Sequence, residues 1–155
     1  MSRKRGANAG MKLVFQQAFS SRQEISNILG GDIRKGIARS ASQPVILLFT
    51  NEDELYSDYF YPKGKYDYCM FTGIGRVGHQ DSTVTNQYYY LNIAVLAHKL
   101  DGRHLLVFEK QKGRYRFVGE YSLLETHQNV QPDRNNDLRR VFVFHLKRIA
   151  DSYAW

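Results

Sequence analysis

Cysteine is nearly absent from the sequence, since Cys69 is the only one among 155 residues. A single cysteine excludes an internal disulfide and any cysteine-rich zinc site. Long apolar runs are also absent, so no segment predicts a membrane span, and the N-terminus lacks the apolar core of a signal peptide. These absences predict a cytoplasmic protein in which Cys69, within an apolar run, packs in the core.

Recognisable catalytic motifs are missing as well. The five histidines are scattered and form no HxxxH or HxH pair that could hold a metal, and His145 alternates with apolar residues as a structural residue would. The segment Glu109-Lys110-Gln111-Lys112 misses the Glu-x-Lys spacing of one nuclease class by one position. The Gly73-Ile74-Gly75 segment lacks the Gly-Lys-Ser/Thr that follows in a phosphate-binding loop. We therefore expect a binding module with no catalytic residue, no metal site and no cofactor.

Positive charge and tyrosine are what the sequence has in excess. The net charge is +7, aromatic residues make up 14% of the chain, and eleven of these are tyrosines. A basic balance favours nucleic acid, an anionic membrane surface or another acidic partner. Tyrosine suits surfaces that are half apolar and half hydrated. Charge alone does not separate these partners from a soluble basic protein with none of them.

The length predicts one domain. We expect a disordered basic arm over residues 1–11, the domain over 12–149 and a C-terminal tail over 150–155. One helix should follow the capping-box pair Ser21 and Glu24, and a second should span 86–100. Seven strands are predicted, with polar loops at 34–42 and 125–137; the strands are 12–15, 44–50, 56–61, 66–72, 103–109, 114–124 and 138–147. This order of elements predicts an α+β fold around a curved sheet or barrel.

Two glycine-containing loops carry cations, at residues 34–40 and 73–80. Glycine lets backbone N–H groups approach a phosphate closely, and arginine grips a phosphate with two parallel donors. Between the loops lies a predicted hairpin rich in rings: Tyr56, Tyr59, Tyr61, Tyr66, Tyr68 and Phe71. Aromatic rings stack on bases, so this arrangement suits nucleic acid. About half of the rings must instead line the core, because a strand has two faces.

The order of several short motifs resembles an SRA (SET- and RING-associated, or YDG) domain. The resemblance covers roughly residues 25–148 and is closest to the SRA-like domains of McrA-type modification-dependent restriction endonucleases. The segments that carry it are Gly30-Gly31 with the loop after it, Phe71-Thr72-Gly73-Ile74-Gly75, Asn92-Ile93-Ala94-Val95-Leu96, the strand from Gly102 to Glu109, and Tyr115-Arg116-Phe117-Val118-Gly119-Glu120-Tyr121. Each motif is weak alone, but their shared order is fairly specific.

This resemblance implies a PUA-like, SRA-like barrel that flips a modified base, a cytosine in the usual case, into an aromatic pocket. By position, the pocket would be formed by Asp58, Tyr59, Tyr61 and Phe71. Asp67 competes with Asp58 as the carboxylate that accepts from the cytosine amino group. Phosphates would be held by Arg34, Lys35, Arg39, Ser40 and Arg76, and the loop near the opened duplex would carry His79 and Gln80. The sequence departs from the family where Phe71 replaces a tyrosine and Gly78-His79-Gln80 replaces Gly-Asp-Gln.

The function that the resemblance implies is a reader of modified DNA in a bacterial modification-dependent restriction system. Its partners would be double-stranded DNA carrying modified bases, a nuclease domain or subunit, and in one arrangement a second copy of the chain. The protein would then lie at the nucleoid of a prokaryote. Two alternatives stay open: a PUA-like module that binds RNA or phosphorothioate DNA, and a nuclease with an unrecognised site.

Overall fold

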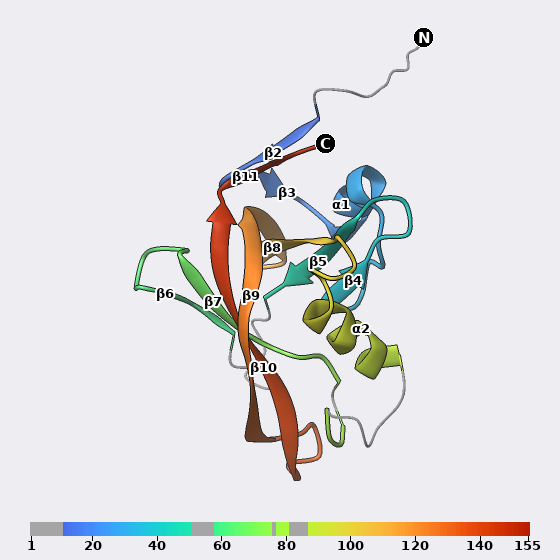
Figure 1. Cartoon of the computed structure of the whole chain (residues 1–155), viewed down its shortest axis with the longest axis vertical. Helices are drawn as coiled ribbons and strands as arrows, with labels where there is room; N and C mark the ends of the chain where they lie inside the picture. The colour runs from blue at the N-terminus through green and yellow to red at the C-terminus, as the bar shows by residue number, and fades with distance from the viewer. Residues whose placement is uncertain (1–10, 51–57, 76, 81–86) are drawn as a thin grey trace.

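The computed structural model describes residues 11–50, 58–75, 77–80 and 87–155 (Figure 1). The helices are α1 (Arg22–Leu29) and α2 (Gln87–Leu96). The strands are β2 (Lys12–Val14), β3 (Ala18–Phe19), β4 (Ile37–Arg39), β5 (Val45–Phe49), β6 (Tyr59–Tyr61), β7 (Tyr68–Thr72), β8 (His104–Gln111), β9 (Arg114–Pro132), β10 (Leu138–Ala150) and β11 (Ser152–Ala154). Neither helix is long and apolar enough to cross a membrane, within the residues described.

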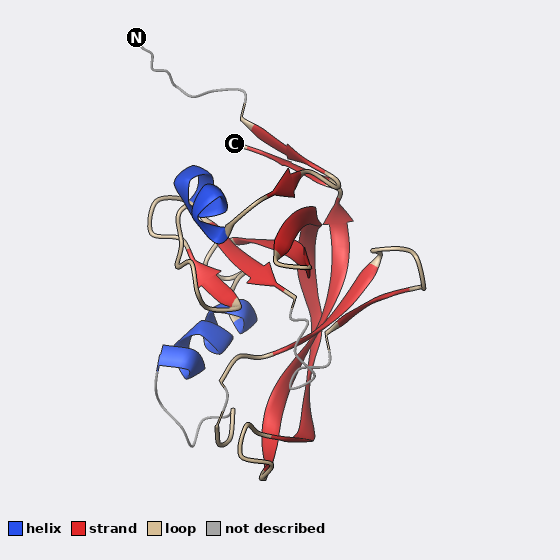
Figure 2. Cartoon of the chain, turned by 180° about the vertical axis from the view of Figure 1, so that it is seen from behind, coloured by secondary structure: helices blue, strands red, loops and turns tan. Residues whose placement is uncertain are grey.

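Eight of the strands form one sheet, in the order β4-β5-β8-β9-β10-β7-β6 with β3 paired to β9. Among the described strands of this sheet, β5 and β8 alone pair in parallel; the other pairs are antiparallel. Both helices lie on the side of the molecule that holds β4 and β5, away from the β6–β7 hairpin (Figure 2). This strongly curved sheet with two flanking helices confirms the predicted α+β class.

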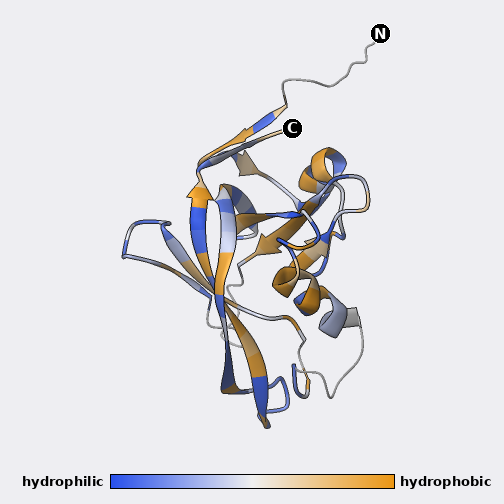
Figure 3. Cartoon of the chain, viewed as in Figure 1, coloured by the Kyte–Doolittle hydropathy of each residue, from blue (hydrophilic) through white to orange (hydrophobic). Residues whose placement is uncertain are grey.

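The core consists of two clusters on opposite faces of β5, which is buried along its whole length. Ile46 and Leu48 point into the cluster that includes Phe71 and Phe144, while Val45, Leu47 and Phe49 point into the cluster under α1. A strand covered on both faces reads as a continuous apolar run, which is why residues 44–50 predicted a central strand. Hydrophobic residues gather on β5 and the helices, whereas the far part of β9 is hydrophilic (Figure 3).

The first helix begins and ends where the sequence predicts. The hydroxyl of Ser21 accepts a hydrogen bond from the Glu24 N–H at 3.2 Å, and the Glu24 carboxylate accepts from the Ser20 N–H at 2.8 Å. Gly30 ends the helix with a φ of 80°, a conformation that favours glycine, and its N–H donates to the Ser26 carbonyl at 2.7 Å. The second helix ends at Leu96, earlier than the predicted residue 100.

Two predicted irregular segments prove to be strands. Most of the polar stretch 125–137 extends β9 to Pro132, which pairs with Leu138 of β10 in a long two-stranded ribbon. Within the predicted loop 34–42, residues 37–39 form the edge strand β4. Residues 124–130 are exposed and held by backbone pairing, so they lack the apolar alternation from which a strand is predicted. In β4 the neighbouring residues Ile37 and Ala38 are both buried, so this short strand shows no alternation either.

The expected C-terminal tail is part of the fold. Ser152, Tyr153 and Ala154 pair with Val14, Leu13 and Lys12, so β11 and β2 form a second small sheet. Tyr153 is buried, and together with Leu13 it joins the cluster under α1. The predicted boundary at residue 149 is therefore wrong, because these last residues bury apolar surface. Residues 1–10 of the predicted arm lie outside the described residues.

Candidate nucleic-acid interface

A cavity of about 450 Å³ lies where β5, β6 and β8 meet. This volume falls in the range of about 300–1,000 Å³ that is typical of small-molecule sites. Thr50, which follows β5, lies on one side, and the wall is completed by residues around the start of β6, in the turn between β6 and β7, and at the end of β8. The described lining residues are Thr50, Asp58, Tyr59, Phe60, Gly64, Lys65, Tyr66, Glu109, Lys110 and Gln111.

Asp58 is the predicted pocket carboxylate that the structure places at this cavity. Its Oδ1 accepts a hydrogen bond from the Thr72 N–H at 2.8 Å, so the start of β6 is fastened to the end of β7 and the carboxylate is oriented. The competing carboxylate, Asp67, does not line the cavity as described. Its side chain is 49% exposed and pairs with Arg148 at 3.7 Å. The structure therefore separates two residues that the sequence left equal.

A second carboxylate and two rings lie on the same cavity wall. The Tyr66 hydroxyl donates to Glu109 Oε1 at 2.8 Å, and the Tyr66 ring meets the Phe60 ring edge to face with centroids 4.8 Å apart. Burial, followed by the hydrogen bond to Glu109, raises the pKa of Tyr66 above its ordinary value, so this hydroxyl remains a donor at neutral pH. Tyr59 is 53% exposed and offers a ring to solvent. The site thus combines rings with hydrogen-bond acceptors.

The two predicted cationic loops lie side by side. A Cβ atom on Gly36 would approach Ile74 Cγ2 to 3.1 Å, so the two loops are closely packed at this position. Asp32 Oδ1 accepts from the N–H groups of Arg34 and Lys35 at 2.6 and 2.9 Å, which fixes the turn. The Phe49 N–H donates to the Gly36 carbonyl at 2.9 Å. The turn with Arg34 and Lys35 therefore lies at the end of β5 that leads to the cavity.

The loop at 73–80 is held by side chains from inside the fold. Gln80 is buried; its Nε2 donates to the carbonyls of Gly73 and Gly75 at 2.7 and 3.1 Å. The Gln80 Oε1 accepts from the Phe142 N–H at 3.2 Å, and His79 Nδ1 accepts from the Arg140 N–H at 3.0 Å. Both residues predicted to lie near the opened duplex thus fasten the loop to β10. Arg76 lies outside the described residues.

Asn92 of α2 also shapes this loop, although it was not predicted as a site residue. Its Oδ1 accepts from the Ile74 N–H at 2.9 Å and its Nδ2 donates to the Ile74 carbonyl at 3.0 Å. A Cβ atom on Gly73 would lie 2.8 Å from both Asn92 Oδ1 and Gln80 Oε1, which leaves room only for glycine. The sequence did contain a sign of this role, since Asn92 is the first residue of the Asn92-Ile93-Ala94-Val95-Leu96 motif. Its side chain fixes the loop.

A second cavity, of about 550 Å³, lies at the turn between β8 and β9. Its described lining holds three cations, Lys112, Arg114 and Arg116, with Ala18, Gln111 and Tyr115. Gln111 lines both cavities, so the cationic surface borders the one that contains Asp58. The sequence predictions did not include these cations, because Arg114 and Arg116 alternate with apolar residues and look like the solvent face of a strand, and Lys112 lies in the turn before them.

Comparison with known families decides the identity of this fold. The sequence model of the family described as "ScoMcrA-like, SRA domain" matches residues 16–154. The chain belongs to this family. The resemblance that the motifs predicted is thereby confirmed, and the match extends through β11. No curated protein sequence matches the chain.

Solved structures show the same fold. The SRA domain resembles the type IV phosphorothioation-dependent restriction endonuclease ScoMcrA, with 21% identity and a TM-score of 0.69 over 88% of this chain and 28% of that one. It also resembles the sulfur-binding and SRA domains of ScoMcrA complexed with phosphorothioated DNA, with 20% identity and a TM-score of 0.67 over 88% of this chain and 40% of that one. The SRA domain of SUVH5 bound to hemimethylated CG DNA matches with 20% identity, a TM-score of 0.63 and 97% of each chain covered. The chain thus spans less than half the length of these two ScoMcrA chains.

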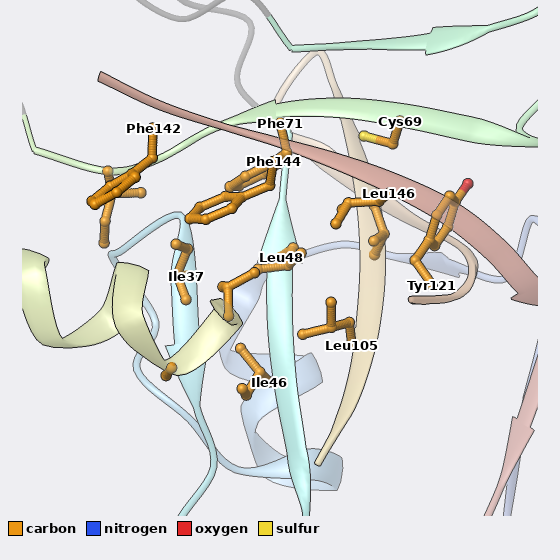
Figure 4. Close-up of a cluster of buried hydrophobic side chains, with 14 of the residues drawn as sticks. Ile37, Ile46, Leu48, Cys69, Phe71, Leu105, Tyr121, Phe142, Phe144 and Leu146 are labelled. Carbon is orange, nitrogen blue, oxygen red and sulfur yellow. The ribbon is translucent and has the colours of Figure 1, made fainter. Parts of the chain in front are cut away.

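Two rings that the SRA resemblance assigned to the pocket lie elsewhere. Phe71 is 1% exposed and packs in the core beside Phe144 (Figure 4), so no base can reach it without opening the core. Tyr61 stacks on Tyr68 at 5.0 Å, its hydroxyl bonds to His145 Nε2, and it is not among the described residues that line the cavity. Cys69 and Phe71 share the inward face of β7. The sequence could not show which face of β7 points inward, because both faces carry rings.

Two predicted phosphate contacts of the SRA domain also need revision. Ser40 is fully buried; its hydroxyl donates to the Leu29 carbonyl at 2.7 Å and accepts from the Gln43 N–H at 3.1 Å. It therefore holds α1 to the loop before β5 and is not available to DNA. Arg39 is exposed but pairs in register with Ile46, further along β5 from the cavity than Arg34 and Lys35. Among the predicted cations, Arg34 and Lys35 therefore lie closer to the cavity than Arg39 does.

Proposed function

We propose that this SRA domain binds double-stranded DNA carrying a modified base, and that the cavity beside Asp58 receives that base after it leaves the duplex. The observation that supports this most is the combination of Asp58, Glu109 and two exposed or partly exposed rings in one cavity of a domain from this family. The SRA domain of SUVH5, which shares the fold, has been solved with methylated and hydroxymethylated DNA.

The carboxylates favour a base with an exocyclic amino group. Asp58 and Glu109 both line the cavity, and a carboxylate accepts hydrogen bonds from the amino group of cytosine. Lys65 and Lys110 line the same cavity, so its two carboxylates are balanced by two cations. Cytosine and its derivatives are therefore the ligands that this wall suits best, and Asp58, oriented by Thr72, is the residue we assign to the amino group.

The rings compensate for the loss of base stacking. Extruding a base from a duplex costs a few kcal/mol, and stacking on an aromatic side chain returns about 1–3 kcal/mol. Tyr59 and Tyr66 both line the cavity; the Tyr59 side chain is 53% exposed, and the Tyr66 hydroxyl donates to Glu109. We assign these two residues to the flipped base in place of Phe71 and Tyr61.

The cations around the cavity suit the phosphates that flank the flipped nucleotide. Arg34 and Lys35 lie at the end of β5, and Lys112, Arg114 and Arg116 line the adjoining surface. A positive net charge of +7 supports binding to a polyanion over the whole domain. Arg76, His79 and Arg39 remain proposals as additional contacts, whereas Ser40 and Gln80 are structural.

The biological setting follows from the relatives. ScoMcrA, AspBHI and TagI are restriction endonucleases, and this chain corresponds to part of the ScoMcrA chains. We infer that the domain is the recognition module of a modification-dependent restriction system in the cytoplasm of a bacterium, acting at the nucleoid. The DNA would be cleaved by a nuclease domain or subunit and not by this chain. A homodimer would allow two modified sites to be read at once.

A second candidate ligand is DNA with a phosphorothioate backbone. It is favoured by the family match, because ScoMcrA was solved with phosphorothioated DNA bound to a fragment that contains a separate sulfur-binding domain as well as an SRA domain. In that case the exposed cationic surface, and not the Asp58 cavity, would bind the phosphorothioate group.

A duplex-binding panel separates these functions. One sequence is prepared as plain duplex, with methyl, hydroxymethyl or glucosylated cytosine, with a phosphorothioate linkage, and as RNA. We expect one of the modified cytosine duplexes to bind about 5-fold to 150-fold more tightly than plain duplex, the range of about 1–3 kcal/mol for a change at one base pair. Affinity for every duplex should fall steeply with salt, because phosphate contacts release counterions.

Equal affinity for all cytosine duplexes would contradict the proposed base reading. A preference for the phosphorothioate duplex alone would favour the second candidate. Preference for RNA would place the domain among PUA-like RNA binders. Cleavage of any of these substrates by the chain alone in the presence of divalent ions would show that it is itself a nuclease.

A further inference from the structure

Three potential metal ligands meet on the outer face of the sheet, away from the cavity. Glu125 and His127 lie on the same face of β9, and His145 of β10 is the register partner of Glu125. One ligand atom from each side chain lies within 4.8 Å of the other two, the one such group among the described residues. Strand pairing therefore brings together residues that are far apart in the sequence.

The distances within the group suit a small divalent cation. His127 Nε2 lies 3.3 Å from Glu125 Oε2, and His145 Nδ1 lies 4.0 Å from the same oxygen. Zinc–ligand bonds of about 2.0–2.1 Å in tetrahedral geometry separate neighbouring ligand atoms by about 3.3 Å. One pair already has this spacing, and a small rotation of the half-buried His145 ring would give it to the second. Glu125 and His127 are exposed and can adjust their side chains.

A further side chain orients one of the ligands. The Tyr61 hydroxyl bonds to His145 Nε2, so the Nδ1 atom of the same ring is the one directed toward Glu125. The Tyr61 and His145 rings are also stacked, with centroids 5.8 Å apart. Metal-binding histidines are commonly held in this way through their second nitrogen, which fixes the tautomer and the ring orientation.

We propose that Glu125, His127 and His145 form a binding site for zinc or a similar first-row divalent cation. Two imidazoles and one carboxylate are a set that zinc accepts, with three protein ligands and a fourth position open to solvent. The ion would tie β9 to β10 beside the bulge between His145 and Leu146, and through Tyr61 to β6. The site is independent of the proposed DNA function, since none of the three ligands lines the cavity as described.

The site is tested by calorimetric titration of the whole chain with ZnCl₂ after dialysis against a chelator. We expect binding of one equivalent, a rise in Tm, and visible absorption typical of tetrahedral Co²⁺ when cobalt replaces zinc. His127→Ala should weaken zinc binding more than about 100-fold, because it removes a ligand outright. Tyr61→Phe should weaken it about 10-fold, the lower range for a residue that supports a ligand.

The control is His104→Ala. His104 Nδ1 lies 2.7 Å from Glu120 Oε2, a histidine–carboxylate pair like that of His127 and Glu125 but outside the three-residue group. This variant should bind zinc like the unaltered chain. Failure of the unaltered chain to bind one equivalent would overturn the proposal, and so would equal zinc affinity in a folded His127→Ala variant.

Discussion

Replacing Phe71 by alanine should destabilise the domain by about 3–5 kcal/mol, the usual range for removing a buried phenylalanine. The ring is 1% exposed and packs in the larger core cluster, so its loss leaves a cavity that the neighbouring strands cannot fill. Urea unfolding followed by circular dichroism measures the change. The more conservative Phe71→Leu should remain folded and keep the affinity for modified duplex, because the ring is not in contact with DNA.

Tyr59→Ala is the matched truncation on the neighbouring strand. Its ring is 53% exposed, so the change in unfolding free energy should be within about 0.5 kcal/mol. Affinity for modified duplex should instead fall by about 1–3 kcal/mol, the contribution of one stacked base. If Phe71→Leu abolished binding in a folded protein while Tyr59→Ala had no effect, the original assignment of Phe71 to the base would be restored.

Asp58→Asn should reduce the preference for modified cytosine duplex by about 1–3 kcal/mol, which is about 5-fold to 150-fold in relative affinity. The amide oxygen can still accept from the Thr72 N–H, so the local fold is retained. The amide nitrogen, however, presents donors where the cytosine amino group needs an acceptor. Competition binding between modified and plain duplex measures the change.

Asp67→Asn is the control for charge. It removes the same negative charge from a side chain that is 49% exposed, pairs with Arg148 and lies outside the cavity lining. Both variants make the domain more basic by one charge, so any general gain in DNA affinity is shared. Loss of preference in Asp67→Asn but not in Asp58→Asn would show that the cavity has been assigned to the wrong carboxylate.

The fold was predictable wherever the sequence carried a local signal. The capping pair Ser21 and Glu24, the apolar run before Thr50 and the two hairpins all correspond to elements of the structure. The far part of the β9–β10 ribbon was missed, because exposed polar residues are held there by backbone pairing alone. The pairing of β11 with β2 was missed for a related reason, since a strand of three residues shows no periodicity.

The site was predictable in its general character but not in every residue. The sequence located the cationic loops, the ring-rich hairpin and a carboxylate among Asp58 and Asp67. It could not tell which rings of β6 and β7 face inward, because a register shift of one residue exchanges the two faces. Gln80 and Ser40 were read as DNA contacts for a similar reason: a polar residue in a loop gives no sign that its hydrogen bonds are made inside the protein.

The histidines show how much depends on strand pairing. His127 and His145 have no spacing that suggests a metal, and His145 was expected to be a buried structural residue. In the structure its side chain is 20% exposed and faces Glu125 across the ribbon. The proposed zinc site thus lies between strands whose register no local motif encodes.

The central claim is that a modified base leaves the duplex and enters the cavity lined by Asp58 and Tyr59. It is tested most directly with 2-aminopurine placed next to the modified cytosine, because its fluorescence rises when the neighbouring base no longer stacks on it. Saturating amounts of the domain should raise the fluorescence of the modified duplex and leave that of the plain duplex nearly unchanged. Saturated binding of the modified duplex without any rise in fluorescence would contradict the account.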